Sequence, residues 1–245
     1  MFIEFLNRDE FYKQYMQILA TRMAIGNMEM EDETVDLTSS SRTIEIYNYM
    51  KSFITLIESN IDKLSPYDIA NVAEMINKNI NFFDKGFRKT QVDVKRAKNF
   101  FPPSPKEVIP RVYSLIDSYY NIWFDLPIYE KEAKFHIELV RIQPFEDGNK
   151  RTARIITNYN LCKQNKAPVI IDGKETDLYF SFIDDYNIDG FAKFLNEKSF
   201  EELETMMKLY ETICGDLCFS EENSIQKIYT KQINNIDKIK KQEDI

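Results

Sequence analysis

Residues 143–154 read Gln-Pro-Phe-Glu-Asp-Gly-Asn-Lys-Arg-Thr-Ala-Arg, and the interpretation of the whole chain depends on this stretch. It lies between two segments whose apolar residues recur at helical spacing. Pro144 cannot continue a helix, while Gly148 and Asn149 tolerate left-handed backbone angles, so a tight turn is predicted between two helices. The second helix begins at about Asn149, and its free N–H groups and positive dipole end face the turn.

Basic residues follow the turn at once. Arg151 and Arg154 are three positions apart and share a helix face, with Lys150 beside them. A helix N-terminus together with cations predicts a polyphosphate pocket, formed by Gly148, Asn149, Lys150, Arg151 and Arg154. Asp147, next to Glu146, is the expected Mg²⁺ ligand, because this ion prefers carboxylate oxygen and keeps most of its waters. The alternative is an ordinary turn followed by a salt-bridged first helical turn.

The stretch resembles the signature of the Fic domain, His-Pro-Phe-x-Asp/Glu-Gly-Asn-Gly/Lys-Arg-x-x-Arg, and departs from it only at the first position. Residues 136–143 are similar to the family's lead-in helix, which often has a His seven residues before the catalytic one. The resemblance extends from about residue 40 to about 200. It implies a mostly α fold, a Fic-like helical bundle with a short β-hairpin flap. Fic proteins typically transfer AMP from ATP to a hydroxyl of a target protein, so ATP and Mg²⁺ are expected ligands.

The single departure falls on the catalytic position. The family's His takes the proton of the attacking hydroxyl, and this chain has Gln143 there, beside Asn149 and Arg151 of the implied catalytic set. An amide has no pKa near neutrality, and the loss of a general base typically costs ~10²–10⁴ in rate. Nucleotide binding is therefore predicted more strongly than turnover. A non-catalytic nucleotide-binding or protein-interaction module remains the alternative.

Lys150 leaves the type of transfer open. AMP-transferring members of the family commonly have Gly at this position, whereas the Doc branch, whose members are similar to kinases, has Lys. Doc-like proteins generally lack the second arginine, which is present here as Arg154. The resemblance therefore favours AMP transfer over a Doc-like phosphotransferase.

Residues 39–48, Ser-Ser-Ser-Arg-Thr-Ile-Glu-Ile-Tyr-Asn, resemble the inhibitory helix of many Fic proteins, Ser/Thr-x-x-x-Glu-Gly/Asn. Ser41 and Glu45 match the first two fixed points, whereas Ile46 does not match the third. By this resemblance Glu45 pairs with Arg154, where a carboxylate neutralises the guanidinium and repels the γ-phosphate. The alternative is a helix capped by serines with an exposed Glu.

A β-hairpin is expected over residues 84–101. Phe87 to Val94 contain alternating β-branched residues, Lys95-Arg96 is the expected turn, and residues 99–101 form the return strand. In the family this position is a flap that holds a target segment by main-chain hydrogen bonds. The resemblance therefore implies a protein partner along residues 87–101. A solvent-exposed hairpin without function is the alternative.

Composition limits the function classes. The chain has 245 residues with 43% apolar residues, and only 6 Gly and 8 Pro, which favours a mostly helical protein. The net charge of −8 argues against nucleic-acid binding in general. No apolar run approaches ~18–20 residues, so no membrane span or signal peptide is expected. Three cysteines fit a reducing cytoplasm, and a homodimer is a further possible assembly.

The remaining pattern is helical. Besides the helices that flank the turn, we expect helices within residues 1–27, 66–80 and 106–124 and a separate one over 198–213. Two short helices are expected over 177–197, a short strand or extended piece over 168–171, and a surface helix or tail over 221–245. The expected organisation is an N-terminal helix and acidic loop (1–38), a Fic core (39–200) and a C-terminal helical extension (201–245). His136 lies two helical turns before Gln143, ~10 Å away and too far to replace the absent base, so it is expected either in the core or behind the site residues.

Overall fold

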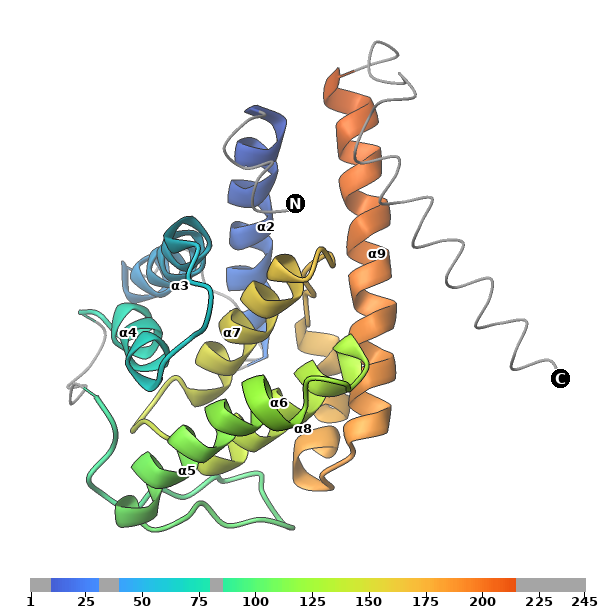
Figure 1. Ribbon diagram of the computed structural model, residues 1–245. Coiled ribbons are helices and arrows are strands. Elements are labelled where there is room, and N and C mark those ends of the chain that lie inside the picture. Colours follow the sequence, from blue (N-terminus) through green and yellow to red (C-terminus); the bar gives the residue numbers. More distant parts are fainter. Residues whose placement is uncertain (1–9, 31–39, 80–85, 215–245) are drawn as a thin grey trace, which may run out of the picture. The chain divides into compact units, whose positions relative to one another are not determined.

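The computed structural model describes residues 10–30, 40–79 and 86–214 (Figure 1). The chain divides into two compact units, Met1–Ser199 and Phe200–Ile245, and residues 143–154 lie in the first. The described α-helices are α2 (Glu10–Glu29), α3 (Ser40–Ser59), α4 (Pro66–Ile76), α5 (Pro105–Asp117), α6 (Ile128–Ile142), α7 (Asn149–Lys163), α8 (Thr176–Asp184) and α9 (Ile188–Cys214). A π-helical turn, η1 (Ser118–Ile122), follows α5, and a 3-10 turn, η2 (Gly173–Glu175), precedes α8. The predicted mostly helical architecture is confirmed.

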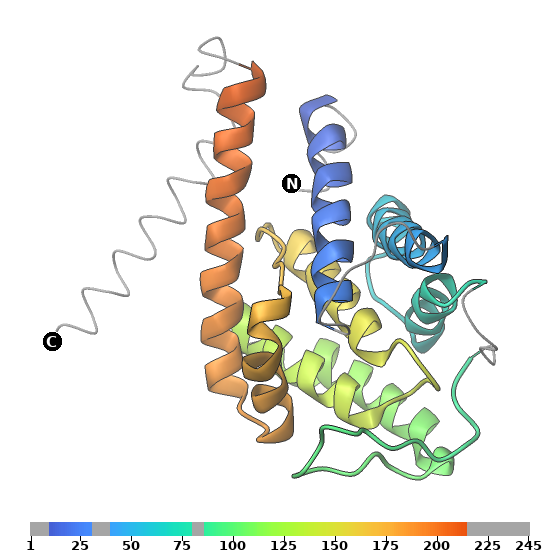
Figure 2. The same cartoon turned by 180° about the vertical axis from the view of Figure 1, so that it is seen from behind.

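Helix α7 is the central element of the first unit. All of its residues from Arg151 to Cys162 are buried, because α3, α4 and α6 pack against it (Figures 1 and 2). A helix that is covered on all sides must pair its polar side chains. Asn158 does so with the backbone of Val169, donating to its oxygen at 2.9 Å and accepting from its nitrogen at 2.7 Å. The helix that starts at the motif is thus fixed along its whole length.

The helix boundaries follow local chemistry. Ser65 caps α4 in a reciprocal capping box with Asp68, and Pro66 occupies the first turn. Helix α6 ends where Gln143 adopts a left-handed backbone with φ of 47°, immediately before Pro144. The chain therefore turns at the predicted position.

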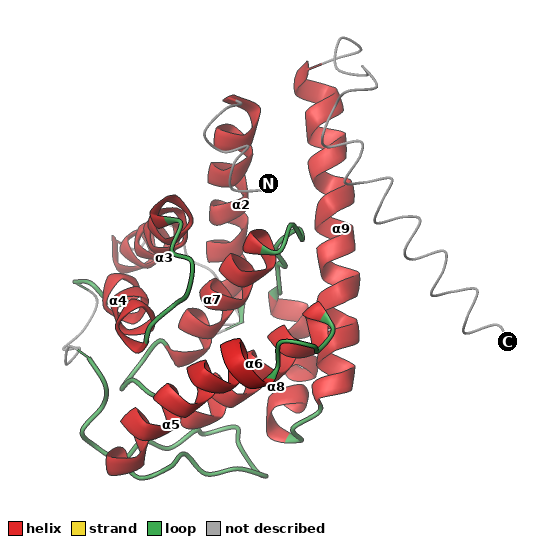
Figure 3. Ribbon diagram, in the orientation of Figure 1, coloured by secondary structure: helices red, strands yellow, loops and turns green. Residues whose placement is uncertain are grey.

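The predicted β-hairpin is wrong. Residues 86–104 contain no strand, and Figure 3 shows this segment as a loop. Its turn is where the sequence places it, since the nitrogen of Ala97 donates to the oxygen of Val94 at 2.9 Å. Side chains, rather than a second strand, hold the backbone: Asp184 Oδ1 accepts from the nitrogens of Lys98 and Asn99 at 2.8 and 2.9 Å. We call residues 87–101 the flap segment.

Three further expectations are settled or fall outside the described residues. Residues 188–214 form one continuous helix instead of separate ones, because no Gly or Pro interrupts the sequence after Gly190. Residues 168–171 are extended without strand pairing. The acidic loop from residue 31 and the tail over 221–245 lie outside the described residues. Among the helices that are described, none is long and apolar enough to cross a membrane.

Candidate active site

The turn between α6 and α7 is closed by the side chain of Asn149. Its Oδ1 accepts from the nitrogen of Phe145 at 2.8 Å, and its Nδ2 donates to the oxygen of Phe145 at 2.8 Å. Nδ2 also lies 3.0 Å from Oε1 of Gln143. Because Asn149 is itself buried, these bonds are shielded from water. Asn149 therefore fixes the loop that leads into the N-terminus of α7.

Gly148 is required by both its backbone and its surroundings. Its φ of +77° is a left-handed conformation, and a Cβ at this position would lie 2.7 Å from Nδ2 of Asn77. Asn77, at the end of α4, donates to the oxygen of Asp147 at 3.2 Å and accepts from Nη2 of Arg151 at 3.4 Å. Sequence analysis missed Asn77, since nothing in its local pattern indicates that α4 ends against a turn 70 residues later.

Gln143 is held in place by its own amide. Nε2 donates to the oxygen of Val140 at 2.7 Å, while Oε1 accepts from Asn149. The side chain is 8% exposed and lines the cavity described below. Both ends of the amide are thus engaged, and neither has a basic lone pair.

Phe145 anchors the turn. It is 1% exposed, and its ring stacks on that of Phe87 with centroids 5.7 Å apart and planes 12° apart. Beside this pair, the nitrogen of Arg88 donates to the oxygen of Pro144 at 2.9 Å. The flap segment is therefore joined to the motif.

Asp147 and Arg151 form an ion pair within the turn. Oδ2 of Asp147 lies 2.9 Å from Nη2 of Arg151, and its Oδ1 accepts from the nitrogen of Gly148 at 2.6 Å. The Asp147 side chain is 59% exposed, whereas that of Arg151 is 9% exposed. The salt-bridged first turn that was the alternative interpretation is thus present. The same carboxylate, with Glu146, offers the oxygen ligands that Mg²⁺ prefers, although Mg²⁺ would compete with Arg151 for Oδ2.

Arg154 is buried with few partners. Its Nη1 lies 3.4 Å from Sδ of Met30, and its guanidinium carbon lies 5.3 Å from the centre of the Tyr179 ring. Within the described part of the chain, its Nε and Nη2 have no hydrogen-bond partner. The buried hydroxyl of Tyr49, on α3, interacts with this guanidinium and with the side chain of Asn27.

The expected pairing of Glu45 with Arg154 is wrong in this structure. Glu45 Oε2 instead lies 3.3 Å from Nη1 of Arg42, one turn earlier on α3. The two arginines compete for one carboxylate, and the local pair three residues apart forms. Helix α3 nevertheless packs against α7, so the resemblance places it beside the motif correctly. The side chain of Ser41 lies outside the described residues.

His136 is a core residue, as the sequence predicts. Its ring nitrogens lie 2.9 Å from Oγ1 of Thr157 and 2.8 Å from the hydroxyl of Tyr179. Burial, reinforced by the charge of Arg154, lowers the pKa of His136 to about 3. The imidazole is therefore a weak base, and both of its nitrogens are occupied by core partners.

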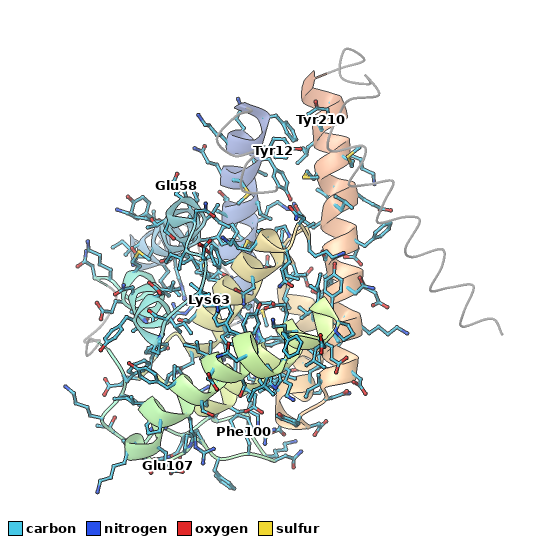
Figure 4. The ribbon with its side chains drawn as sticks, viewed as in Figure 1. Tyr12, Glu58, Lys63, Phe100, Glu107 and Tyr210 are labelled. Carbon is cyan, nitrogen blue, oxygen red and sulfur yellow. The ribbon has the colours of Figure 1, made fainter. Side chains whose placement is uncertain are left out.

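A cavity of about 390 Å³ opens over the turn, within the size range of small-molecule sites. The motif contributes Gln143, Glu146, Asp147, Gly148, Asn149 and Lys150; the flap segment contributes Asp93 to Ala97 and Phe100; Met30, Val140, Phe180, Ile183 and Asp184 complete the lining. Figure 4 labels Phe100 at the end of the flap segment that faces α6 and α8. Arg151 and Arg154 are not among the lining side chains.

Cations gather on one aromatic ring in this cavity. Nζ of Lys150 lies 4.5 Å from the centre of the Phe180 ring, and the guanidinium carbon of Arg96 lies 5.0 Å from it. Such positions are favourable for the cations and leave an apolar, basic wall beside the α7 N-terminus. Phe180 was not singled out from the sequence, because an aromatic residue in an amphipathic helix ordinarily indicates core packing.

Known proteins share both sequence and fold with this helical bundle. Residues 63–161 match the model of the Fic/DOC family. The solved Fic-domain signalling protein of Bacteroides thetaiotaomicron has a TM-score of 0.72 at 19% identity, covering 83% of this chain and 91% of that one. Fic-1 of Caenorhabditis elegans gives 0.68 at 20% identity, covering 84% and 67%. The match to the Fic/DOC family therefore covers residues 63–161, which include the motif at 143–154.

The sequence relatives are protein adenylyltransferases. The chain is 27% identical over 195 residues to protein adenylyltransferase Fic of Aedes aegypti, covering 74% of this chain and 36% of the relative. It is 30% identical over 144 residues to protein adenylyltransferase fic-1 of Caenorhabditis elegans, covering 58% and 28%. The chain thus has homology to protein adenylyltransferases, and it spans about a third of the length of these relatives.

Proposed function

We propose that this protein binds ATP at the start of α7 and that its chemistry is Fic-type AMP transfer to a protein hydroxyl, limited by Gln143. One observation carries the proposal: Asp147, Gly148, Asn149 and Lys150 line a single cavity at the N-terminus of a buried helix. The amide groups and the dipole of that end attract phosphate. The homology to adenylyltransferases supports ATP as the nucleotide.

The proposed roles follow position. The backbone of Gly148 to Lys150 would hold a phosphate, and Arg151 would contact it after release from Asp147. Asp147 and Glu146 would hold Mg²⁺, which supplies charge neutralisation of the phosphates when it is bound. Arg154 would offset the charge on the outer phosphates.

The flap segment is the proposed place for the target protein. Residues 93–97 line the cavity, so a peptide lying along the flap segment would present a side chain to the bound nucleotide. Main-chain hydrogen bonding to an extended segment is a general mode of peptide recognition. Residues 91–94 belong to no helix or strand, so their backbone is not already paired in a sheet.

Helix α3 is the proposed source of inhibition. Glu45 and Tyr49 are four residues apart and share a face of α3, and Tyr49 is the neighbour of Arg154. Glu45 would therefore exchange its partner Arg42 for Arg154 by a movement of its side chain over one helical turn. A carboxylate in that place would oppose the outer phosphates by like charge.

Incubation with α-labelled and γ-labelled ATP tests the proposed reaction, using the chain as given and Gln143→His. We expect Gln143→His to transfer α-label to protein at least ~10²-fold faster than the Gln form, because it regains a general base. Transfer of γ-label would instead favour the Doc-like phosphotransferase. If neither form transfers label but ATP still binds, the non-catalytic nucleotide-binding module is correct.

Thermal unfolding tests the binding step separately. ATP with Mg²⁺ should raise the melting temperature of the chain as given, because a ligand that binds only the folded state stabilises it. Arg154→Ala should reduce this shift. Arg111→Ala, which changes an arginine on the exposed face of α5, should leave the shift unchanged. The absence of any shift with ATP, ADP and AMP would remove the proposal.

A further inference from the structure

Met30 separates the cavity from the second arginine of the motif. It directly follows α2, and its nitrogen donates to the oxygen of Gly26 at 3.1 Å. Its side chain is 6% exposed and lines the cavity, while its Sδ lies 3.4 Å from Nη1 of Arg154. Arg154 does not line the cavity. The thioether therefore covers the guanidinium on the side from which a nucleotide would approach.

The covered group has unused hydrogen-bonding capacity. Nε and Nη2 of Arg154 have no hydrogen-bond partner among the described residues. The hydroxyl of Tyr49 interacts with the Arg154 guanidinium and with the Asn27 amide. Burial raises the pKa of Tyr49, so its hydroxyl stays protonated and can donate. A neutral sulfur is a weak acceptor for a guanidinium. Three donor atoms around a buried positive charge are the arrangement that an anionic oxygen satisfies best.

We propose that Met30 is a specificity-determining residue: it covers the Arg154–Tyr49 anion subsite, so a nucleotide reaches that subsite only when the Met30 side chain turns away. This inference rests on the proposed nucleotide site. A monophosphate held at the Gly148–Lys150 turn does not require the movement. A triphosphate, whose outer phosphates extend further, does. Methionine suits such a cover, because its unbranched chain changes rotamer readily.

Met30 therefore weakens the binding of ATP and leaves the binding of AMP unaffected. Displacing a buried thioether opposes triphosphate binding, and its removal should relieve that opposition for ATP and not for AMP. The relevant residue is outside 63–161, the part of the chain that matches the Fic/DOC family model. The selectivity between ATP and AMP would then depend on Met30, the residue that directly follows α2, rather than on the motif.

Calorimetric titration with a non-hydrolysable ATP analogue and with AMP tests the inference. We expect Met30→Ala to tighten the ATP analogue about tenfold, equivalent to ~1.4 kcal/mol, and to change AMP by less than about twofold. Met30→Leu keeps an apolar cover of similar volume and should behave as the natural chain does. Met28→Ala, which truncates another buried methionine at the end of α2, is the matched control and should change neither ligand.

The Met30→Ala substitution in the Arg154→Ala chain tests whether the increase in affinity for the ATP analogue depends on the Arg154 guanidinium. There Met30→Ala should give no gain for the ATP analogue, and Tyr49→Phe in the Met30→Ala chain should lose part of it. An equal gain for AMP, a gain that persists without Arg154, or an unchanged affinity for the ATP analogue would overturn the inference while leaving the nucleotide site intact. If neither the natural chain nor Met30→Ala binds any nucleotide, the proposed function and this inference both fail. Binding of ATP only after Met30→Ala supports both.

Discussion

Nε of Arg88 donates to the backbone oxygen of Gln143 across 2.6 Å, joining the flap segment to the residue that stands at the catalytic position. The same guanidinium donates to the oxygens of Thr90 at 2.8 Å and Pro103 at 2.5 Å. Arg88 is 3% exposed, so one buried cation supports both ends of the flap segment and the end of α6. The flap segment is therefore positioned by a side chain and not by strand pairing.

Arg88→Lys should loosen the flap segment. A lysine keeps the charge but cannot reach three carbonyl oxygens with a planar fork, so we expect a loss of about 2–4 kcal/mol in the free energy of unfolding. Urea unfolding measures it, and hydrogen exchange should show faster exchange at Ala97. Arg111→Lys, which changes an exposed arginine paired with Glu107, should cost less than about 0.5 kcal/mol. Equal stabilities of Arg88→Lys and the natural chain would contradict this role.

Gly148→Ala should damage the turn more than its backbone angle alone requires. Gly86 has a φ of +80° with open space around its missing Cβ, while Gly148 has a φ of +77° and a Cβ position that collides with Asn77. We expect Gly86→Ala to cost about 1 kcal/mol from the left-handed backbone alone, and Gly148→Ala to cost at least ~1 kcal/mol more. Only Gly148→Ala should also remove stabilisation by ATP. Matching losses in the two variants would show that the contact with Asn77 has no effect.

Glu45→Gly tests the proposed inhibition by α3. In the Gln143→His chain, which has its base restored, removal of this carboxylate should increase self-labelling by labelled ATP several-fold, because no negative charge then opposes the outer phosphates. Glu58→Gly is the control: Glu58 is an exposed glutamate on α3, labelled in Figure 4, and carries a comparable helix penalty of ~1 kcal/mol. Labelling that is the same in all three chains would remove the inhibitory role of Glu45.

Glu132 should make stability depend on pH. It is fully buried in α6, and burial raises its pKa to about 7 despite donors from Tyr119, Asn160 and Gln164. From its ordinary value near 4.5 up to 7, the folded chain therefore holds a proton that the unfolded chain has released. Rising pH lowers the free energy of unfolding across this window, by on the order of 3 kcal/mol in full.

Glu132→Gln isolates that effect from an opposite one. The pKa of His136 is lowered to about 3, so between pH 3 and 6.5 the unfolded chain binds the extra proton and stability rises with pH. Urea unfolding of both chains from pH 5 to pH 8 should show the natural chain losing stability relative to Glu132→Gln as pH rises. A difference that is constant with pH would mean that Glu132 titrates at its ordinary value.

The sequence by itself determined the helical class, the turn at residues 143–149 and the identity of the domain, because these depend on local chemistry. Pro144 and Gly148 dictate the turn wherever it lies in space, and apolar spacing dictates the helices around it. The absence of a basic group at Gln143 likewise follows from the amide alone. The buried place of His136 was also predictable, since its neighbours on the helix are apolar.

Only the tertiary structure decided which partners these residues have. Three contacts join residues that are far apart in the sequence, and no local pattern specifies such pairs. They are Met30 with Arg154, Asn77 with Gly148 and Arg88 with Gln143, separated by 124, 71 and 55 residues. The hairpin failed as a prediction for the same reason. β-propensity indicates a strand only where a neighbouring strand pairs with it. Here the side chains of Arg88 and Asp184 hydrogen-bond backbone groups of the flap segment and its flank instead. Several partners are equally compatible with the local sequence. The free-energy cost of burying an unpaired polar group decides which of these contacts form, and burial is set by the tertiary structure.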